Sequence, residues 1–211
     1  MPQLQSSPAS SNVPFMVAMA AVVVASNFLV QFPVNLDLGA IQLKEILTWG
    51  AFTYPVAFLI TDLANRKFGP QQARLVVVVG FLLAVVLSIW LATPRIAVAS
   101  GTAFLVAQLL DVSIFDRLRQ SAWWQAPLIS SLLGSALDTL LFFSLAFAPA
   151  FGMLDFGGEG GSLGFAVPFL SVGADVPLWL SLAVGDFIVK VLVGLAMLLP
   201  YGIVARKTAI A

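Results

Sequence analysis

The sequence predicts an all-α membrane protein, a bundle of six transmembrane helices with both termini in the cytoplasm. Three observations support this. Of the 211 residues, 60% are hydrophobic and only 9% are charged, whereas a soluble domain carries about 25% charged residues. Six apolar stretches have about the 20 residues that a helix needs to cross a bilayer. Lys and Arg gather in the loops on one side of these stretches. An ordinary soluble enzyme and a disordered chain are excluded.

The composition also restricts the chemistry of the chain. Cysteine and histidine are absent, so disulfides, thiolate nucleophiles, imidazole bases and Cys/His metal sites are excluded. We expect no cofactor and no metal, and a protein other than an enzyme. An intramembrane enzyme that uses carboxylates alone stays open as an alternative. Ten Lys and Arg balance ten Asp and Glu, which argues against nucleic acid as a partner.

The polar residues 1–13 predict a disordered cytoplasmic tail, followed by a transmembrane domain over residues 14–205 and a short cytoplasmic tail over 206–211. The first apolar stretch, Pro14 to Phe32, has the length of a signal peptide. No basic residue precedes it, and hydrophobic segments continue to the end of the chain. We therefore interpret it as the first span.

Five further apolar stretches complete the expected bundle. They are Ile46 to Leu63, Arg74 to Thr93, Ile96 to Phe115, Pro127 to Pro149 and Leu178 to Val204. At ~1.5 Å per residue the six helices reach roughly 27–40 Å, which is enough to cross a ~30 Å hydrocarbon core. Continuous apolar runs such as LVVVVGFLLAVVL favour helices over the alternating strands of a β-barrel.

The distribution of Lys and Arg predicts the orientation. Seven lie in the loops on the side of the termini, namely Arg66, Lys67, Arg74, Arg117, Arg119, Arg206 and Lys207. The opposite loops hold only Lys44 and Arg95. Seven against two places both termini in the cytoplasm. The stretch GMLDFGGEGGSLG between the last two spans is then a solvated outer loop or a gating element, and LGFAVPFLSV after it is too short to span.

Three ionisable residues lie deep in the predicted spans. Asp138 is eleven residues into the fifth span, roughly 16 Å deep, and Lys190 is twelve residues into the antiparallel sixth span, roughly 18 Å deep. Asp186, four residues before Lys190, shares its helix face. Charges at the bilayer centre are costly and normally face a cavity or the bundle interior. We expect a substrate or proton site, with a structural ion pair as the alternative. In that site Asp186 would hold the lysine and leave Asp138 free for the substrate.

Neutral polar and aromatic residues extend the candidate site. Asn27, Gln108 and Thr139 add hydrogen-bonding groups within the spans, or bond to neighbouring helices. Pro55 interrupts the second span, and Thr53 is a candidate partner for the freed backbone groups. Trp49 and Tyr54 offer stacking faces to a flat ring, or anchor the helix at the interface.

A second set of polar residues lies near the cytoplasmic ends of the spans. Asp62, Asn65 and Arg66 close the second span, and Asp111 lies near the end of the fourth. These residues form an inner gate of paired charges, or cap helices in the interface. The sequence leaves the two readings open.

Three segments together resemble the queuosine precursor transporter family, also called the vitamin uptake transporter family. They are FTYPVAFLITDLANRKFGP, SALDTLLFFSLAF and LAVGDFIVKVLVGLAMLLPYGIV. The resemblance assigns the family's polar positions to Thr53, Pro55, Asp62, Asn65, Gly69, Asp138, Thr139, Asp186 and Lys190. The Gly-rich outer loop departs from the family in being longer than expected.

The resemblance implies a multi-pass inner-membrane protein that imports queuosine precursors, the deazaguanine bases salvaged for the queuosine modification of tRNA. A deazaguanine base and the lipid bilayer are the implied partners. The alternative is a substrate-binding subunit of an energy-coupling-factor vitamin importer. The chain lacks a Walker motif, so that alternative needs a separate ATPase module. The sequence leaves open such a module and a homo-oligomer.

Overall fold

A computed structural model describes residues 11–39, 41–45, 47–155, 163–171 and 173–209 of the chain. Its α-helices are α1 (Val13–Leu29), α2 (Gly50–Thr53), α3 (Pro55–Phe68), α4 (Pro70–Leu91), α5 (Pro94–Leu118), α6 (Gln125–Phe147) and α7 (Leu178–Ala209). Short 3₁₀ segments cover Leu43–Glu45, Pro149–Leu154 and Phe169–Ser171. The strands are β1 (Asp37–Leu38), β2 (Ile41–Gln42), β3 (Ala166–Pro168) and β4 (Asp175–Pro177).

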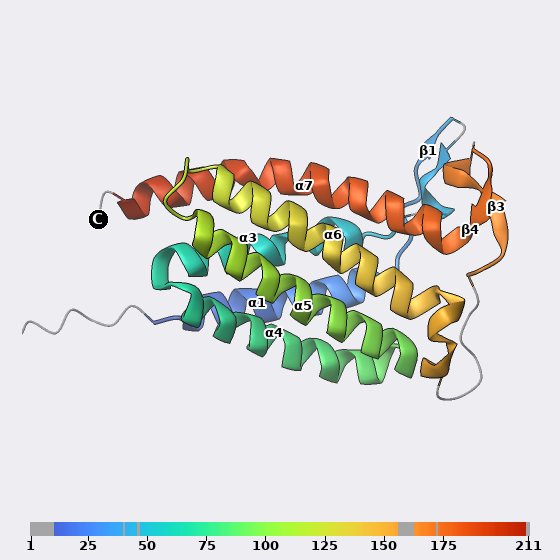
Figure 1. Cartoon of the computed structure of the whole chain (residues 1–211), viewed down its shortest axis with the longest axis horizontal. Helices are drawn as coiled ribbons and strands as arrows, with labels where there is room; N and C mark the ends of the chain where they lie inside the picture. Colours follow the sequence, from blue (N-terminus) through green and yellow to red (C-terminus); the bar gives the residue numbers. More distant parts are fainter. Residues whose placement is uncertain (1–10, 40, 46, 156–162, 172, 210–211) are drawn as a thin grey trace, which may run out of the picture.

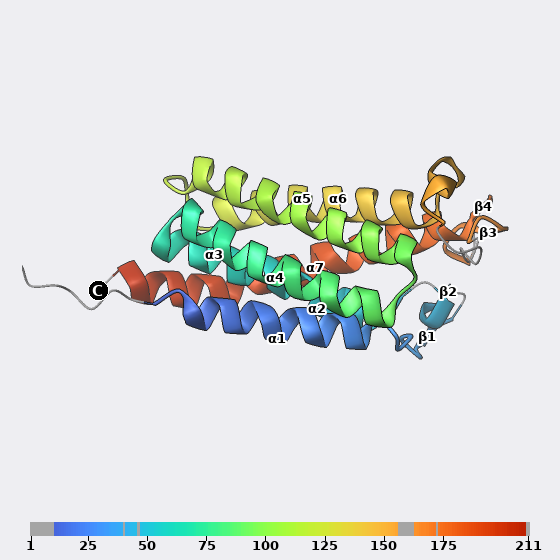
Figure 2. The ribbon, with the colours of Figure 1, turned by 90° about the horizontal axis from the view of Figure 1, so that it is seen from below.

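The helices lie side by side along the long axis of the molecule (Figure 1). Turned by 90°, the bundle has α1 on one side and α5 with α6 on the other, with α4 and α7 between them (Figure 2). The start of α1 and the end of α7 lie at the same end of the bundle, and the strands lie at the opposite end (Figure 1). The α5–α6 hairpin has the most extensive helix–helix contact.

Prolines mark where several helices begin. Proline stands in the first turn of α1, α3, α4 and α5, where its missing N–H has no intrahelical partner to lose. Thr93 caps α5 by accepting a hydrogen bond from the backbone N–H of Ile96. Gly69 joins α3 to α4 with a φ of 85°, a conformation that glycine adopts without steric cost. Together these residues fix where the helices begin and allow the abrupt turn between α3 and α4.

Pro55 divides the second predicted span into α2 and α3. Tyr54 between them keeps helical angles of −58° and −41°, so the two pieces form one kinked helix rather than two helices joined by a loop. A proline inside a helix removes a backbone hydrogen bond and clashes with the preceding turn. The helix continues to Phe68, beyond the predicted end at Leu63, because Ala64 and Asn65 are still packed inside the bundle.

The helices have the composition of a membrane protein. Four of them, α4, α5, α6 and residues 178–206 of α7, are long and apolar enough to cross a bilayer, and α1 is a shorter apolar helix. Large apolar side chains such as Leu82, Ile89 and Trp90 face outward, where lipid rather than water accounts for them. The predicted class of helical, multi-pass membrane protein is confirmed.

Two small hairpins were not predicted, because strands of two or three residues leave no periodic signal. β1 pairs antiparallel with β2, with Leu38 opposite Ile41. β3 pairs antiparallel with β4, with Val167 opposite Val176. The stretch LGFAVPFLSV, which was expected to be too short to span the membrane, contributes β3. Of the predicted Gly-rich outer loop, residues 156–162 lie outside the described part of the chain.

Candidate functional site

A buried cluster of charges joins α6 to α7. The Nζ atom of Lys190 lies 2.7 Å from Oδ2 of Asp138 and 2.5 Å from Oδ2 of Asp186. It also donates to Oγ1 of Thr139 at 3.2 Å, and Thr139 in turn donates to Asp186 at 2.8 Å. Asp138 and Lys190 are each 4% exposed at the side chain. The four residues form one closed network in the middle of two long helices.

This network corrects one expectation. Asp186 was expected to hold Lys190 alone and to leave Asp138 free for a ligand. In the structure both carboxylates bind the ammonium group, and the shared contact occupies one oxygen of each. Depth and helical spacing predicted which residues meet, but side-chain rotamers decide how the bonds are divided. A ligand that binds Asp138 must use its other oxygen or replace Lys190.

Tyr54 forms an aromatic wall of the cluster. Its ring centre lies 5.5 Å from Nζ of Lys190, within the range of a cation–π interaction. The ring packs edge-on against Phe104, with centroids 6.0 Å apart. Tyr54 is the residue at the Pro55 kink. The interrupted helix thus presents an aromatic side chain to the charges of α6 and α7.

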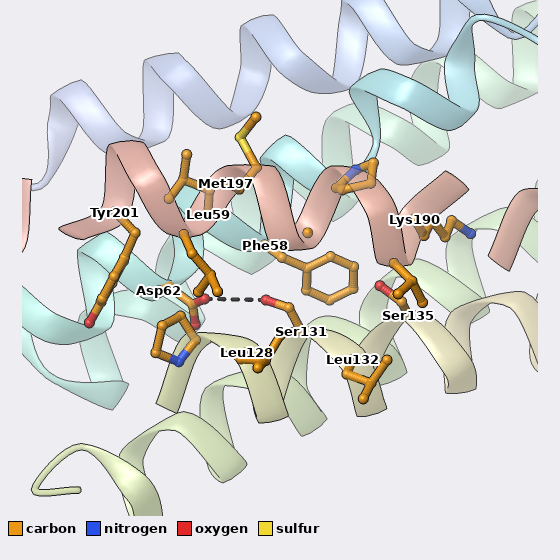
Figure 3. A pocket seen from close by; sticks show the side chains of 15 residues that line it. Phe58, Leu59, Asp62, Leu128, Ser131, Leu132, Ser135, Lys190, Met197 and Tyr201 are labelled. Atoms are coloured by element: carbon orange, nitrogen blue, oxygen red, sulfur yellow. Dashed lines mark hydrogen bonds between the residues drawn. The ribbon is translucent and has the colours of Figure 1, made fainter. Parts of the chain in front are cut away.

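A cleft between α3, α6 and α7 leads away from Lys190 (Figure 3). The space left free inside it is only about 30 Å³, which is enough for a water molecule but not for a heterocyclic base, so a ligand of that size would have to spread the helices. Most of its wall is apolar. Its polar lining consists of Lys190, Ser135, Ser131, Asp62 and Tyr201. The cleft therefore connects the charge cluster to the predicted inner gate.

Asp62 lies at the end of the cleft away from Lys190, close to Asp111 and to two serines of α6. Both carboxyl groups are almost fully buried and are within interaction range of each other. The hydroxyls of Ser130 and Ser131 donate to Oδ1 and Oδ2 of Asp62, each at 3.3 Å. Asn65, one turn after Asp62, donates to the carbonyl of Val112 at 3.0 Å. The three predicted gate residues thus lie together.

Two arginines tie the adjoining helix corners together. The guanidinium of Arg66 donates to the carbonyl of Arg119 at 2.5 Å. Arg119 in return donates to the carbonyls of Asn65 and Arg66 at 3.0 and 3.2 Å. This reciprocal contact joins the α3–α4 corner to the end of α5, next to the Asp62–Asp111 pair.

Four other predicted residues lie apart from the Lys190 contacts. Asn27 donates to the carbonyl of Val23 in its own helix, and Thr53 bonds to Ser26 and to the carbonyl of Gly50. Gln108 is fully buried and accepts a hydrogen bond from Thr61 at 2.8 Å. Thr61 directly precedes Asp62, and Gln108 lies about one helical turn before Asp111. Trp49 is 45% exposed and packs against Phe52.

The serines and the tyrosine of the cleft were missed by the sequence analysis. Ser131 precedes Asp138 by seven residues and Tyr201 follows Lys190 by eleven, so each shares a helix face with a charged residue two or three turns away. That spacing was the available signal. Hydroxyl groups are common inside membrane helices, so their identity alone did not distinguish them.

The sequence matches the family described as "Putative vitamin uptake transporter" over residues 48–93 and 87–204. The chain belongs to this family. The predicted resemblance is confirmed, and the protein is a membrane transporter rather than an enzyme. The matched ranges contain every residue of the charge cluster, of the cleft and of the inner gate.

Curated relatives give the family a more specific name. The chain is 33% identical to the "Probable queuosine precursor transporter" of Haemophilus influenzae, over 87% of this chain and 81% of the relative. It is 34% identical to the "Queuosine precursor transporter" of Escherichia coli, over 86% and 80% of the two chains. A "Probable queuosine precursor transporter" of Bacillus subtilis is 26% identical over 76% and 72%. No solved structure matches significantly.

Proposed function

We propose that this vitamin uptake transporter imports queuosine precursors, the deazaguanine bases, across the cytoplasmic membrane. The observation that carries the proposal is the buried Asp138–Lys190–Asp186 network at the end of a cleft, in a chain whose relatives are named for this substrate. Ionisable groups at membrane depth normally belong to a transport site rather than to packing.

The chemistry of the network suits a deazaguanine. The base offers N–H donors along one edge and a carbonyl group. The free oxygen of Asp138 can accept from the N–H donors, and Lys190 can donate to the carbonyl. Tyr54 supplies a ring face for the flat heterocycle. Thr139 completes the site, and Gln108, Thr53, Asn27 and Trp49 remain proposed members of a wider site on the strength of their place in the spans.

The arrangement of the chain in the membrane follows from its charges. We propose six crossings within residues 14–205, counting α1 and the kinked α2–α3 helix with the four long helices. The corners between α3 and α4 and after α5, together with the end of α7, carry seven of the ten basic residues. These corners lie at the same end as the start of α1 (Figure 1). Basic loops stay in the cytoplasm, which supports cytoplasmic tails at both termini.

Asp62, Asn65 and Asp111 form the proposed inner gate. Of the three, Asp62 lines the cleft, and the Arg66–Arg119 contact braces the adjoining corners. A substrate released from Lys190 toward the cytoplasm would pass Asp62, because both residues line the same cleft (Figure 3). Release would then require α3 and α6 to move apart at Ser130 and Ser131.

Growth of cells that cannot synthesise queuosine precursors tests this function. Cells that express the protein and receive a free deazaguanine base at low concentration should regain queuosine in their tRNA. Asp138→Asn should reduce this recovery at limiting base. Asp175→Asn, which removes an exposed carboxylate on β4, should leave it unchanged. Unmodified tRNA despite normal amounts of membrane-inserted protein would refute import of these bases.

A further inference from the structure

The Asp62–Asp111 pair has a property that a gate does not require. The hydrogen bonds from Thr61 to Gln108 and from Asn65 to Val112 flank the pair on α3 and α5 and hold the two buried carboxyl groups close together. Ionised carboxylates only accept hydrogen bonds, so neither group can bond to the other unless one of them carries a proton. Buried carboxyl groups in contact resist ionising together, and such a pair shares a proton.

No cation neutralises this pair within the described part of the chain. Neither aspartate takes part in a salt bridge there. Two unbalanced carboxylates inside a membrane helix bundle would each carry a large desolvation cost. Binding one proton removes much of that cost. The physics of burial thus favours a protonated pair over an ionised one.

The charged groups around the pair are already engaged elsewhere. Arg66 on α3 and Arg119 after α5 direct their guanidinium groups to main-chain carbonyls. Lys190 on α7 is held by its own two carboxylates at the other end of the cleft. Helix α6 presents only the hydroxyls of Ser130 and Ser131 to Asp62. A proton is therefore the cation that fits this site.

Two unpartnered polar groups point to a ligand at the pair. Asp111 is fully buried, and Asp62 and Ser130 are its polar neighbours. Its two carboxyl oxygens accept no hydrogen bond from any residue that the structure describes. Among the residues that the structure describes, the hydroxyl of Tyr201 is also buried without a hydrogen-bond partner, and Tyr201 lines the cleft with Asp62 (Figure 3). Buried polar atoms are rarely left unpaired. A proton on the pair would supply a missing donor.

We propose that Asp62 and Asp111 bind one proton that crosses the membrane with each substrate molecule, so that the proton gradient drives import. The proposal rests on the import function proposed above. The pair takes up the proton while the transporter faces the outer side and releases it to the cytoplasm after the base leaves. Asp62 links the proton site to the proposed substrate site, because Asp62 and Lys190 line the same cleft.

Infrared spectroscopy of the purified protein tests the proton directly, without any transport. A protonated buried carboxylic acid has a C=O stretching band that an ionised carboxylate lacks. We expect this band at neutral pH in the wild type, a shifted band in either single variant Asp62→Asn or Asp111→Asn, and its loss when both substitutions are combined. The control Asp175→Asn should keep it, since that carboxylate is exposed. A wild-type band that survives both substitutions, or no band at all, would overturn the protonated pair.

Proteoliposomes test whether the proton is carried. With the membrane potential clamped and the outside more acidic by one pH unit, one proton per neutral base supports up to about tenfold accumulation of a radiolabelled deazaguanine. Asp111→Asn should bring the accumulation close to onefold, while some exchange of internal for external base persists and reports a folded protein. Asp175→Asn should accumulate the base as the wild type does.

The two proposals fail differently in this experiment. Wild-type uptake that ignores the pH gradient would overturn proton coupling and leave import intact. Wild-type vesicles that take up no base under any gradient would refute the import function, while the infrared result would still decide whether the pair is protonated.

Discussion

At the scale of single residues, the binding cluster depends on an unequal number of charges. Lys190 faces two carboxylates, so the ionised network carries one negative charge in excess. That excess favours a ligand rich in N–H donors over an anionic one. Thr139 also donates to Asp186 and fixes the orientation of that carboxylate. Asp138 is consequently the residue whose second oxygen is best placed to bind a base.

Replacing Asp138 tests this assignment. Asp138→Asn keeps the volume but turns one acceptor into a donor that faces the N–H groups of the base. A mismatched charge-assisted bond costs ~1.5–3 kcal/mol, so base affinity should fall about tenfold to hundredfold. Asp186 still holds Lys190, so the protein should elute as a folded species. Calorimetry on that species measures the loss, and wild-type affinity would make Asp138 structural.

Lys190 should respond in a different way. Lys190→Met leaves two buried carboxylates without a cation, and breaking a buried pair in this way costs ~3–5 kcal/mol. We expect a large loss of folded protein after solubilisation, measured by size-exclusion chromatography. Lys190→Arg keeps the charge and should recover much of the folded fraction. Full stability of Lys190→Met would mean that the carboxylates are not ionised in the fold.

At the scale of elements, the kink between α2 and α3 positions Tyr54. Pro55→Ala restores the backbone hydrogen bond of that turn and should raise the unfolding temperature, because an interior proline costs a helix about 3 kcal/mol. Straightening the helix should withdraw Tyr54 from Lys190 and lower base affinity several-fold. Pro70→Ala, in the first turn of α4, is the matched control and should change neither value. Unchanged affinity in a stabilised Pro55→Ala protein would separate the kink from binding.

Close helix packing at Gly134 provides a second test at this scale. A Cβ atom on Gly134 would lie 2.7 Å from Cε1 of Phe58 and 3.4 Å from the carbonyl of Ala107. Gly134→Ala should therefore push α6 from α3 and destabilise the protein by about 1–3 kcal/mol. Gly194→Ala meets no atom within 4 Å and should be tolerated. Thermal unfolding in detergent compares the two, and equal stability would contradict the tight α3–α6 contact.

The same elements show how far the sequence could lead. The apolar stretches and the prolines predicted the helices, and depth along two antiparallel spans predicted that Asp138 and Lys190 would meet. The partners of Asp62 were not predictable, because Ser130 and Ser131 reach it from a helix 68 and 69 residues away. The bond that Gln108 accepts from Thr61, one residue before Asp62, was likewise not predictable. Which side chains pair between distant helices depends on how each helix is rotated about its axis in the bundle. A single sequence does not determine that rotation.

At the scale of the whole molecule, the two ends of the bundle differ in how they are held. At the strand end, Arg95 is buried and donates to the carbonyls of Leu145 and Ala148 and to Asp155. This contact fastens the start of α5 to the end of α6. At the other end, the corners meet through Arg66 and Arg119, and the cleft reaches toward them. The asymmetry supports a cytoplasmic exit at the basic end.

The orientation itself can be measured with single cysteines, because the chain contains none. Ser121 is exposed between α5 and α6, and Ala174 is exposed between β3 and β4, at opposite ends of the bundle. With basic corners in the cytoplasm, a membrane-impermeant maleimide added to spheroplasts should label Ala174→Cys at once. It should label Ser121→Cys only after permeabilisation. The cysteine-free wild type gives the background. Labelling of Ser121→Cys alone in sealed spheroplasts would invert the topology and, with it, the direction assigned to the cleft, the gate and the proton.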